Sequence, residues 1–338
     1  MRTTAFTFSL LLLTSTAFAE PVVTSVSPSS GPVTGGTAIT IHGSGFTDLC
    51  TAGCAGQTGI NIGDVWVPSV RVIDDHTLTA VTPPHLPGTY SIERVQPNGT
   101  ARANHAFTFE GDATEAFDRL LLPVFIPTTL GAFDSQFISR FTVMNKSEQP
   151  LDVYGASFPC FILCPASETP VATIRAEEPI SNILQSGRPG TFLYVPKGRE
   201  NDFTGTLRVQ DLSRQAETWG TEIPIVRDRD FTDGTTNLLD VPLKEGFRET
   251  LRVYSTTQGL VRARVFSTGE TPGLLADTIV PLRAPRDIHD PAYGELGLYI
   301  AGDVGRVEIE PLTPGLRYWA FVSVTNNATQ HITTITPH

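Results

Sequence analysis

The sequence has little charge, only 2 Met and no long hydrophobic run after its first twenty residues. Charged residues make up 17% of the 338, below the roughly 25% of an average soluble chain. The hydrophobic share of 40% is still enough to build cores, which excludes disorder over the whole length. No stretch reaches the roughly 18 uninterrupted apolar residues of a membrane helix, so we expect no membrane insertion.

Clusters of basic residues are also missing. Lys and Arg number 24 against 35 Asp and Glu, which gives a net charge of −11. Nucleic-acid binding depends on attraction between basic side chains and phosphates, so this balance excludes a nucleic-acid partner.

The sequence contains none of the common catalytic motifs. A nucleophile elbow needs G-x-S-x-G, and the closest text is His42-Gly43-Ser44-Gly45. The seven His are scattered and form no H-E-x-x-H motif. The acidic pairs Glu177-Glu178, Asp74-Asp75 and Asp287-x-x-Asp290 are near-adjacent, so they need not face each other across a cleft as glycosidase carboxylates do. We therefore expect a protein that is not an enzyme.

The N-terminal segment has the pattern of a secretory signal peptide. Arg2 supplies a positive charge, Ala5 to Leu13 is mostly apolar, and Ala17-Phe18-Ala19 is a small-x-small cleavage site. We predict a signal peptide over residues 1–19, cleaved after Ala19. The mature chain is then secreted, into the periplasm or the extracellular space.

Four cysteines form two C-x3-C pairs, Cys50 with Cys54 and Cys160 with Cys164. An even number of Cys in an oxidising compartment predicts disulfides, here two that each close a short loop. The alternative is one tetrahedral zinc site that uses all four thiolates. The predicted export favours the disulfides, because an exported thiol cluster would need protection from oxidation.

Strand and turn signals follow one another from Pro21 onward, in the text PVVTSVSPSSGPVTGGTAITIHGSGFT. Val22 to Val26 and Thr37 to His42 are predicted strands, and Pro28 to Gly36 is a predicted turn whose glycines can take positive φ. Val65-Trp66-Val67 reads as a later strand, in which alternation directs Trp66 away from the two valines and exposes it.

This text resembles the opening of an IPT/TIG domain. The resemblance rests on Val26-Ser27-Pro28, Ser30-Gly31-Pro32, Gly35-Gly36-Thr37 and Gly43-Ser44-Gly45-Phe46, in that order. It implies an immunoglobulin-like β-sandwich over residues 20–111. Asp48 to Gly56, which carries Cys50 and Cys54, is an insert relative to the family.

The remainder of the chain predicts two further β-sandwiches, at residues 117–236 and 237–338. A weak repeat supports this division, because similar residues recur 100 positions apart: Gly205, Leu207, Val209, Leu212 and Trp219 against Gly305, Val307, Ile309, Leu312 and Trp319. Trp219 and Trp319 would then lie at equivalent core positions. The fold class is all-β, with tandem immunoglobulin-like sandwiches. One larger two-sheet domain is the alternative for the remainder.

Two candidate binding features stand out. Asp228, Asp230 and Asp233 place three carboxylates in six residues before Gly234, an arrangement that suits Ca²⁺. The run lacks the distal Glu of an EF-hand, which favours a linker with solvated charges. Trp66, if exposed, could stack on a sugar ring.

These observations predict a non-enzymatic exported protein for extracellular or cell-surface recognition, adhesion or structural support. Its partner would be an extracellular protein or a glycan, and no cofactor is expected besides calcium. The alternative is an accessory or carbohydrate-binding part of a secreted carbohydrate-active system.

Overall fold

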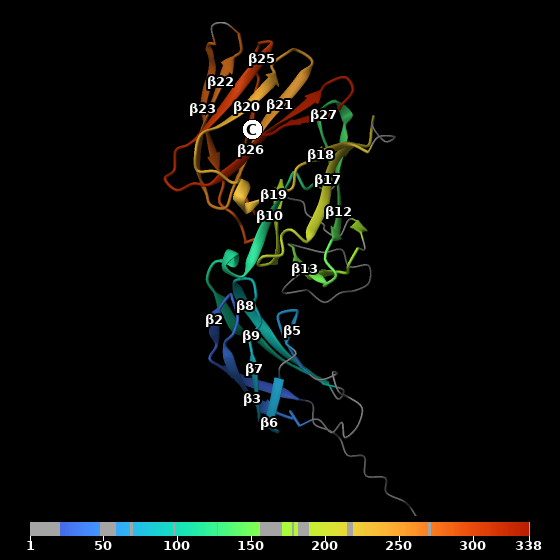
Figure 1. Cartoon of the computed structure of the whole chain (residues 1–338), viewed down its shortest axis with the longest axis vertical. Helices are drawn as coiled ribbons and strands as arrows, with labels where there is room; N and C mark the ends of the chain where they lie inside the picture. Colours follow the sequence, from blue (N-terminus) through green and yellow to red (C-terminus); the bar gives the residue numbers. More distant parts are fainter. Residues whose placement is uncertain are drawn as a thin grey trace, which may run out of the picture. The chain divides into compact units, whose positions relative to one another are not determined.

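The regular structure of the described residues consists almost entirely of β-strands, as the composition predicts (Figure 1). The computed structural model describes residues 21–47, 59–67, 70–96, 99–126, 128–155, 171–177, 179–181, 189–214, 219–269 and 272–337. Three 3-10 turns accompany the strands in these ranges, at Ala113–Glu115, Ala132–Asp134 and Asp228–Asp230. Residue contacts divide the chain into two compact units, Met1–Gly111 and Asp112–His338.

The N-terminal unit is a sandwich of two sheets. One sheet has the order β1-β3-β7-β6 and the other β2-β9-β8-β4-β5. All neighbouring strands are antiparallel except β2 and β9, which run parallel. The strands are β1 (Val22–Ser27), β2 (Ser30–Pro32), β3 (Ala38–Ser44), β4 (Gly59–Ile62), β5 (Val65–Val67), β6 (Val70–Asp74), β7 (Thr77–Val81), β8 (Gly88–Gln96) and β9 (Gly99–Glu110).

The sequence pattern explains this sandwich. Ile39 and Ile41 alternate with polar residues in β3 and are buried between the sheets. Gly35 and Gly36 in the preceding turn have φ values of +72° and +82°, which glycine adopts without steric cost. The strands predicted at residues 22–26 and 37–42 are thus confirmed as β1 and β3.

The second unit begins with a sandwich that we call the middle sandwich. Its sheets have the orders β14-β13-β16-β10-β19 and β11-β12-β17-β18, and β15 pairs with β12. Its strands are β10 (Phe117–Pro123), β11 (Thr129–Leu130), β12 (Gln136–Asn145), β13 (Leu151–Tyr154), β14 (Val171–Ile174), β15 (Ile180–Ser181), β16 (Gly190–Pro196), β17 (Phe203–Asp211), β18 (Thr221–Ile223) and β19 (Val226–Arg227).

The C-terminal sandwich completes the second unit. Its two sheets have the orders β20-β25-β22-β23 and β24-β21-β26-β27. Its strands are β20 (Thr236–Pro242), β21 (Phe247–Ser255), β22 (Gly259–Ser267), β23 (Leu274–Leu282), β24 (Ala292–Gly297), β25 (Val304–Pro311), β26 (Tyr318–Asn326) and β27 (Ile332–Ile335).

The middle and C-terminal sandwiches share one strand order. The path β14-β13-β16-β10 corresponds to β23-β22-β25-β20, and β15-β12-β17-β18 corresponds to β24-β21-β26-β27. Each sandwich has its own buried apolar cluster. The prediction of two related sandwiches is therefore confirmed.

The residue alignment behind that prediction was wrong by one strand. The 100-residue offset matched Leu207 in β17 with Val307 in β25, but β17 corresponds to β26. Phe141 pairs with Leu207 across β12 and β17, as Leu251 pairs with Val322 across β21 and β26, so the counterpart of Leu207 lies in β26 and not at Val307 of β25. Any half-buried strand alternates apolar and polar residues, so this pattern does not distinguish neighbouring strands.

The two tryptophans of the proposed repeat are not equivalent. Trp219 is 78% exposed in the segment before β18, so its assignment to a core is wrong. Trp319 is only 6% exposed, but it lies on the outer face of β26 because its neighbours Tyr318 and Ala320 point into the sandwich core.

Trp319 belongs to an aromatic cluster at the junction of the two sandwiches. Its ring lies 5.3 Å from that of Phe321 and 6.3 Å from that of Tyr254. The Tyr254 hydroxyl donates a hydrogen bond of 2.9 Å to the Pro189 carbonyl in the middle sandwich. Ile332 of β27 also packs in the middle sandwich's core. This buried junction joins the two sandwiches into one compact unit.

Three predictions fall wholly or partly outside the described ranges. The signal peptide and all four cysteines lie there, so the cleavage site, the disulfides and the zinc alternative stay predictions. No helix in the described part of the chain is long and apolar enough to cross a membrane.

Candidate functional site

Trp66 lies on the edge strand β5 with its side chain on the outer face of the N-terminal unit's five-stranded sheet. It is 42% exposed, whereas Val67 beside it is buried. The indole lies against the backbone of Gly59 in β4, where an added Cβ would come within 2.1–2.8 Å of three ring atoms. Glycine thus leaves room for the ring to pack closely on the sheet. The exposure that alternation predicts for Trp66 is present.

Three polar residues continue from Trp66 across the same sheet. Trp66 pairs with Asn61, Asn61 with Glu93, and Glu93 with Arg102, in successive strands β5, β4, β8 and β9. Their chain neighbours Ile60, Ile62, Ile92 and Ala101 are buried, so alternation directs the row to the outer face. We call Trp66, Asn61, Glu93 and Arg102 the Trp66 row.

Hydrogen bonds fix the polar end of the Trp66 row. Arg102 forms an ion pair with Glu93 through Nη1. It donates from Nη2 to Ser91 Oγ at 3.1 Å and from Nε to Asn104 Oδ1 at 2.8 Å. The guanidinium and carboxylate are therefore held close to the sheet surface.

The spacing of strands sets the size of the Trp66 row. Neighbouring strands lie about 4.8 Å apart, so four strands place its ends about 14 Å from each other. An aromatic face at one end and donors and acceptors along the rest can contact an extended polar ligand. The sequence predicted only Trp66. Asn61, Glu93 and Arg102 could be found only once the register of four strands was known.

The Asp74-Asp75 pair noted in the sequence has structural partners, whereas Glu178 of the Glu177-Glu178 pair lies outside the described residues. Asp75 accepts hydrogen bonds from the Thr47 hydroxyl at 2.6 Å and from the backbone N–H groups of Thr47 and Gly45. These bonds lower the pKa of Asp75. Asp74 accepts from the His76 N–H. The pair closes a turn and presents no carboxylate arranged for acid–base chemistry.

Asp290 has a comparable role in the C-terminal sandwich. It is buried and accepts hydrogen bonds from Arg283 Nη1 and Arg286 Nε, each at 2.8 Å. The pKa of Asp290 is lowered, because these two arginines outweigh the opposing effect of burial, which raises it. The loop that Asp290 anchors contacts the middle sandwich, where Tyr194 donates a 2.7 Å hydrogen bond to Ile288 O.

The aspartate run predicted for calcium is divided between different partners. Asp228 accepts from Arg119 Nε and Arg317 Nη1, each at 3.0 Å. Asp230 accepts from the Arg227 N–H at 2.9 Å. In the described ranges, no group of three or more His, Cys, Asp or Glu is placed to hold a metal ion. Asp228, Asp230 and Asp233 therefore do not form such a group. The structure gives Asp228 an ion-pairing role at the junction, and a calcium role stays a prediction.

A small cavity lies at the junction of the middle and C-terminal sandwiches. Its volume is about 90 Å³, and most of its lining is apolar, including Val209, Ile223 and Ile332. Arg252 also lines it and donates to Ser323 Oγ. A cavity of this size admits a few waters and not a sugar chain.

The comparisons with known proteins identify one part of the chain. No curated protein matches the sequence. Among solved structures, SGBP-B from a complex xyloglucan utilization locus in Bacteroides uniformis is 14% identical, with 94% of this chain and 74% of that chain covered and a TM-score of 0.22. An auxiliary nutrient binding protein from Bacteroides thetaiotaomicron is 10% identical, with 94% and 98% covered and a TM-score of 0.22. TM-scores this low carry no argument about function.

The comparison with protein families identifies the N-terminal sandwich. The profile of the IPT/TIG domain matches residues 21–109, about a quarter of the chain. The match begins at β1 and ends in β9, so it covers both sheets of the N-terminal sandwich and contains the whole Trp66 row. Residues 21–109 of this chain are an IPT/TIG domain.

Proposed function

We propose that the chain is a non-enzymatic exported recognition protein that binds a glycan on the outer face of its IPT/TIG sheet. The observation that carries this proposal is the Trp66 row. A flat exposed indole can stack on the C–H face of a sugar ring, and the amide, carboxylate and guanidinium beside it can bond hydroxyl groups.

The shape of the face favours a glycan chain over a small metabolite. A small-molecule site is usually a concave pocket that encloses its ligand. The Trp66 row is instead spread over four strands of one sheet, with a length of about 14 Å that corresponds to a few sugar units. Export, predicted from residues 1–19, would bring this face into contact with extracellular polysaccharides.

The second candidate, recognition of an extracellular protein, lacks a comparable feature. Protein interfaces have an apolar centre with aromatic anchors. On the outer face of this sheet the register places one aromatic residue beside three polar ones. This composition fits a hydroxyl-rich ligand better than an apolar protein surface.

The experiment is a polysaccharide screen with a hydrolysis readout on the same samples. Purified chain is run through native gels that contain neutral or acidic polysaccharides, and reducing ends are measured in parallel. We expect retardation by at least one polysaccharide without release of reducing ends. Retardation by none of them would contradict glycan recognition, and release of reducing ends would contradict the non-enzymatic role.

A further inference from the structure

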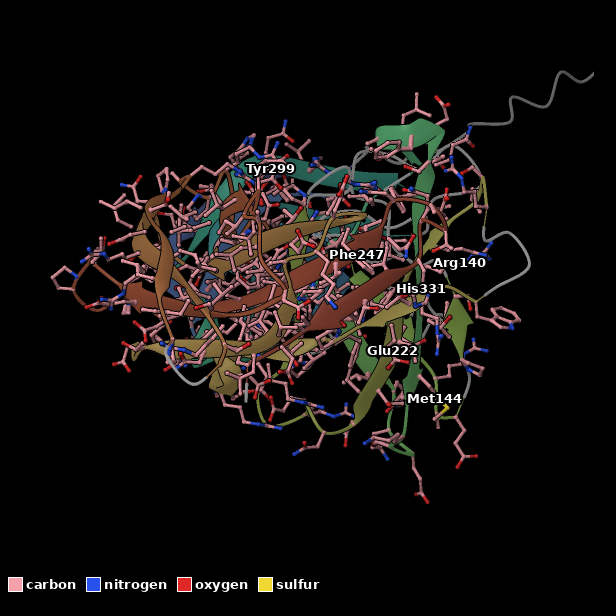
Figure 2. All side chains as sticks on the ribbon, turned by 90° about the horizontal axis from the view of Figure 1, so that it is seen from above. Arg140, Met144, Glu222, Phe247, Tyr299 and His331 are labelled. Carbon is pink, nitrogen blue, oxygen red and sulfur yellow. The ribbon has the colours of Figure 1, made fainter. Side chains whose placement is uncertain are left out.

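A second group of exposed aromatic and basic side chains lies in the other unit, at the margin of the junction. It contains Phe133, Arg214, Arg248 and Tyr299 together with the amides of Asn327 and Gln330, and we call it the Arg248 cluster. In Figure 2 the cluster can be found from the labels of Tyr299, of Phe247, which precedes Arg248, and of His331, which follows Gln330. The backbone of Tyr299 lies beside that of Arg248, because the preceding Leu298 N–H donates to Glu249 O at 2.9 Å.

The guanidinium of Arg248 is held in a fixed position. It donates from Nη1 to Asn327 Oδ1 at 2.5 Å and from Nη2 to Gln330 Oε1 at 2.8 Å. Its Cζ lies 5.0 Å from the centre of the Phe133 ring. Both hydrogen-bond partners are neutral, and no carboxylate in the described part of the chain forms an ion pair with Arg248. Its positive charge is therefore fixed without being neutralised nearby.

A second cation lies beside it. Arg214 donates from Nη2 to Phe133 O at 2.6 Å, and its Nη1 is 3.9 Å from Asp211 Oδ2. Partial burial and the charge of Arg214 both lower the pKa of Arg248, which still stays protonated in water. Asp134 supplies an exposed carboxylate next to Phe133 at the rim. Two arginines thus gather in a chain whose net charge is −11.

The two aromatic side chains of the Arg248 cluster are exposed, and the backbone near one of them has positive φ. Phe133 is 56% exposed and Tyr299 is 94% exposed. Phe133, Asp134 and Gln330 have φ values of 57°, 56° and 57°, a region that residues other than glycine rarely adopt. Such conformations concentrate at binding sites, where they position a side chain. If Arg248 served only to link the two sandwiches, its contact with Phe133 would be explained. The almost complete exposure of Tyr299 would not be.

We propose that the Arg248 cluster is a second binding site, for a sugar that carries a carboxylate. Arg248 and Arg214 donate hydrogen bonds to the carboxylate, and Phe133 and Tyr299 contact the faces of the sugar ring. Arginine recognises carboxylates by charge-assisted hydrogen bonds, which are about twice as strong as neutral ones. The sugar nature of the ligand rests on the proposed function. The negative charge follows from this cluster alone.

The test compares two ligands that differ only in charge. Oligogalacturonate and its methyl ester are titrated into the full chain by calorimetry, at low and at physiological salt. We expect the acid to bind at least about tenfold more tightly than the ester, and more weakly as salt rises. Arg248→Gln should lower the affinity for the acid by at least about tenfold. Arg262→Gln is the matched control, because Arg262 is paired with Asp277 on another sheet.

Tyr299→Ala is a second test variant, for use if Arg248→Gln impairs folding. Tyr299 is almost fully exposed, so its truncation should leave the melting transition unchanged while weakening acid binding. Equal binding of acid and ester, or unchanged binding in Tyr299→Ala, would overturn the inference. Binding of neutral glycans without binding of oligogalacturonate would overturn this site and leave the proposed function standing. Failure of all glycans would overturn both.

Discussion

The ring of Tyr254 in the C-terminal sandwich lies directly against the α-carbon of Gly190 in the middle sandwich. An added Cβ at Gly190 would come within 2.7 Å of Tyr254 Cε1. Tyr254 is fully buried, accepts from the Val124 N–H and donates to Pro189 O, so the ring has no space to move. Burial accordingly raises the pKa of the Tyr254 hydroxyl. One glycine therefore sets how closely the two sandwiches approach.

Gly190→Ala should destabilise the second unit by about 1–3 kcal/mol, the usual cost of overpacking a close-packed site. Denaturant unfolding of the variant measures this loss. Gly234→Ala is the control, because an added Cβ there meets only Thr232 Oγ1 at 3.5 Å. Equal stability of both variants would show that the Tyr254 contact does not limit the junction.

Replacement of the two C-terminal tryptophans should have opposite consequences. Trp319→Ala removes a buried ring from the aromatic cluster and should cost about 3–5 kcal/mol. Trp219→Ala removes an exposed ring and should stay within about 0.5 kcal/mol. Thermal melts of both variants measure the difference. A large loss in Trp219→Ala would restore the equivalence that the sequence repeat suggested.

The sequence predicted the kind of fold more accurately than the position of each strand. Alternating apolar residues are enough to predict strands such as β3, and ordered IPT/TIG motifs are enough to predict the first sandwich. The strand equivalence of the later sandwiches was missed because β17 and β25 share the alternation Leu207-x-Val209 and Val307-x-Ile309, whereas β26, the true counterpart of β17, is apolar on both faces. The packing of Trp319 against Tyr254 at the junction joins residues far apart in the chain, which no local pattern contains.

The stability of the C-terminal sandwich should depend on the ionisation of Glu249. Its side chain is 7% exposed, and its Oε1 has no hydrogen-bond partner in the described structure. Burial raises the pKa of Glu249 above its ordinary value of 4.5. As pH rises above that value the unfolded chain ionises first, so the folded state loses stability until Glu249 itself ionises.

Glu249→Gln removes this loss because the amide does not ionise. The variant should be more stable than the parent at neutral pH, and the gain should disappear when the pH falls below about 4. Unfolding curves measured from pH 3 to pH 8 test this, with the exposed Glu245→Gln as control. A gain that is the same at every pH would exclude ionisation as its cause.

Asp290 should have the opposite pH dependence. Its pKa is lowered in the folded state, so its contribution is present above its ordinary value of 3.8 and is lost as pH falls through the lowered value. Asp290→Asn should cost about 1–3 kcal/mol at neutral pH, because Arg283 and Arg286 lose a charged acceptor. The cost should shrink in acid. Asp277→Asn, at a more exposed ion pair, should cost less.

The candidate binding surfaces could be predicted only in part. Trp66 was accessible from sequence because three residues, Val65-Trp66-Val67, reveal its side of the strand. Its partners Asn61, Glu93 and Arg102 come from three other strands, and their alignment depends on register. Arg248 gave no sequence signal at all, because its neighbours Phe133 and Gln330 lie more than 80 positions away in either direction.

The most direct test of the central claim is the affinity of Trp66→Ala for the glycan that the screen identifies. Trp66 supplies the stacking surface, so its loss should weaken binding by about tenfold while the melting transition of the IPT/TIG domain is retained. Trp219→Ala, which removes a more exposed indole from the other unit, should bind like the parent. Binding unchanged in Trp66→Ala would contradict glycan recognition by this face.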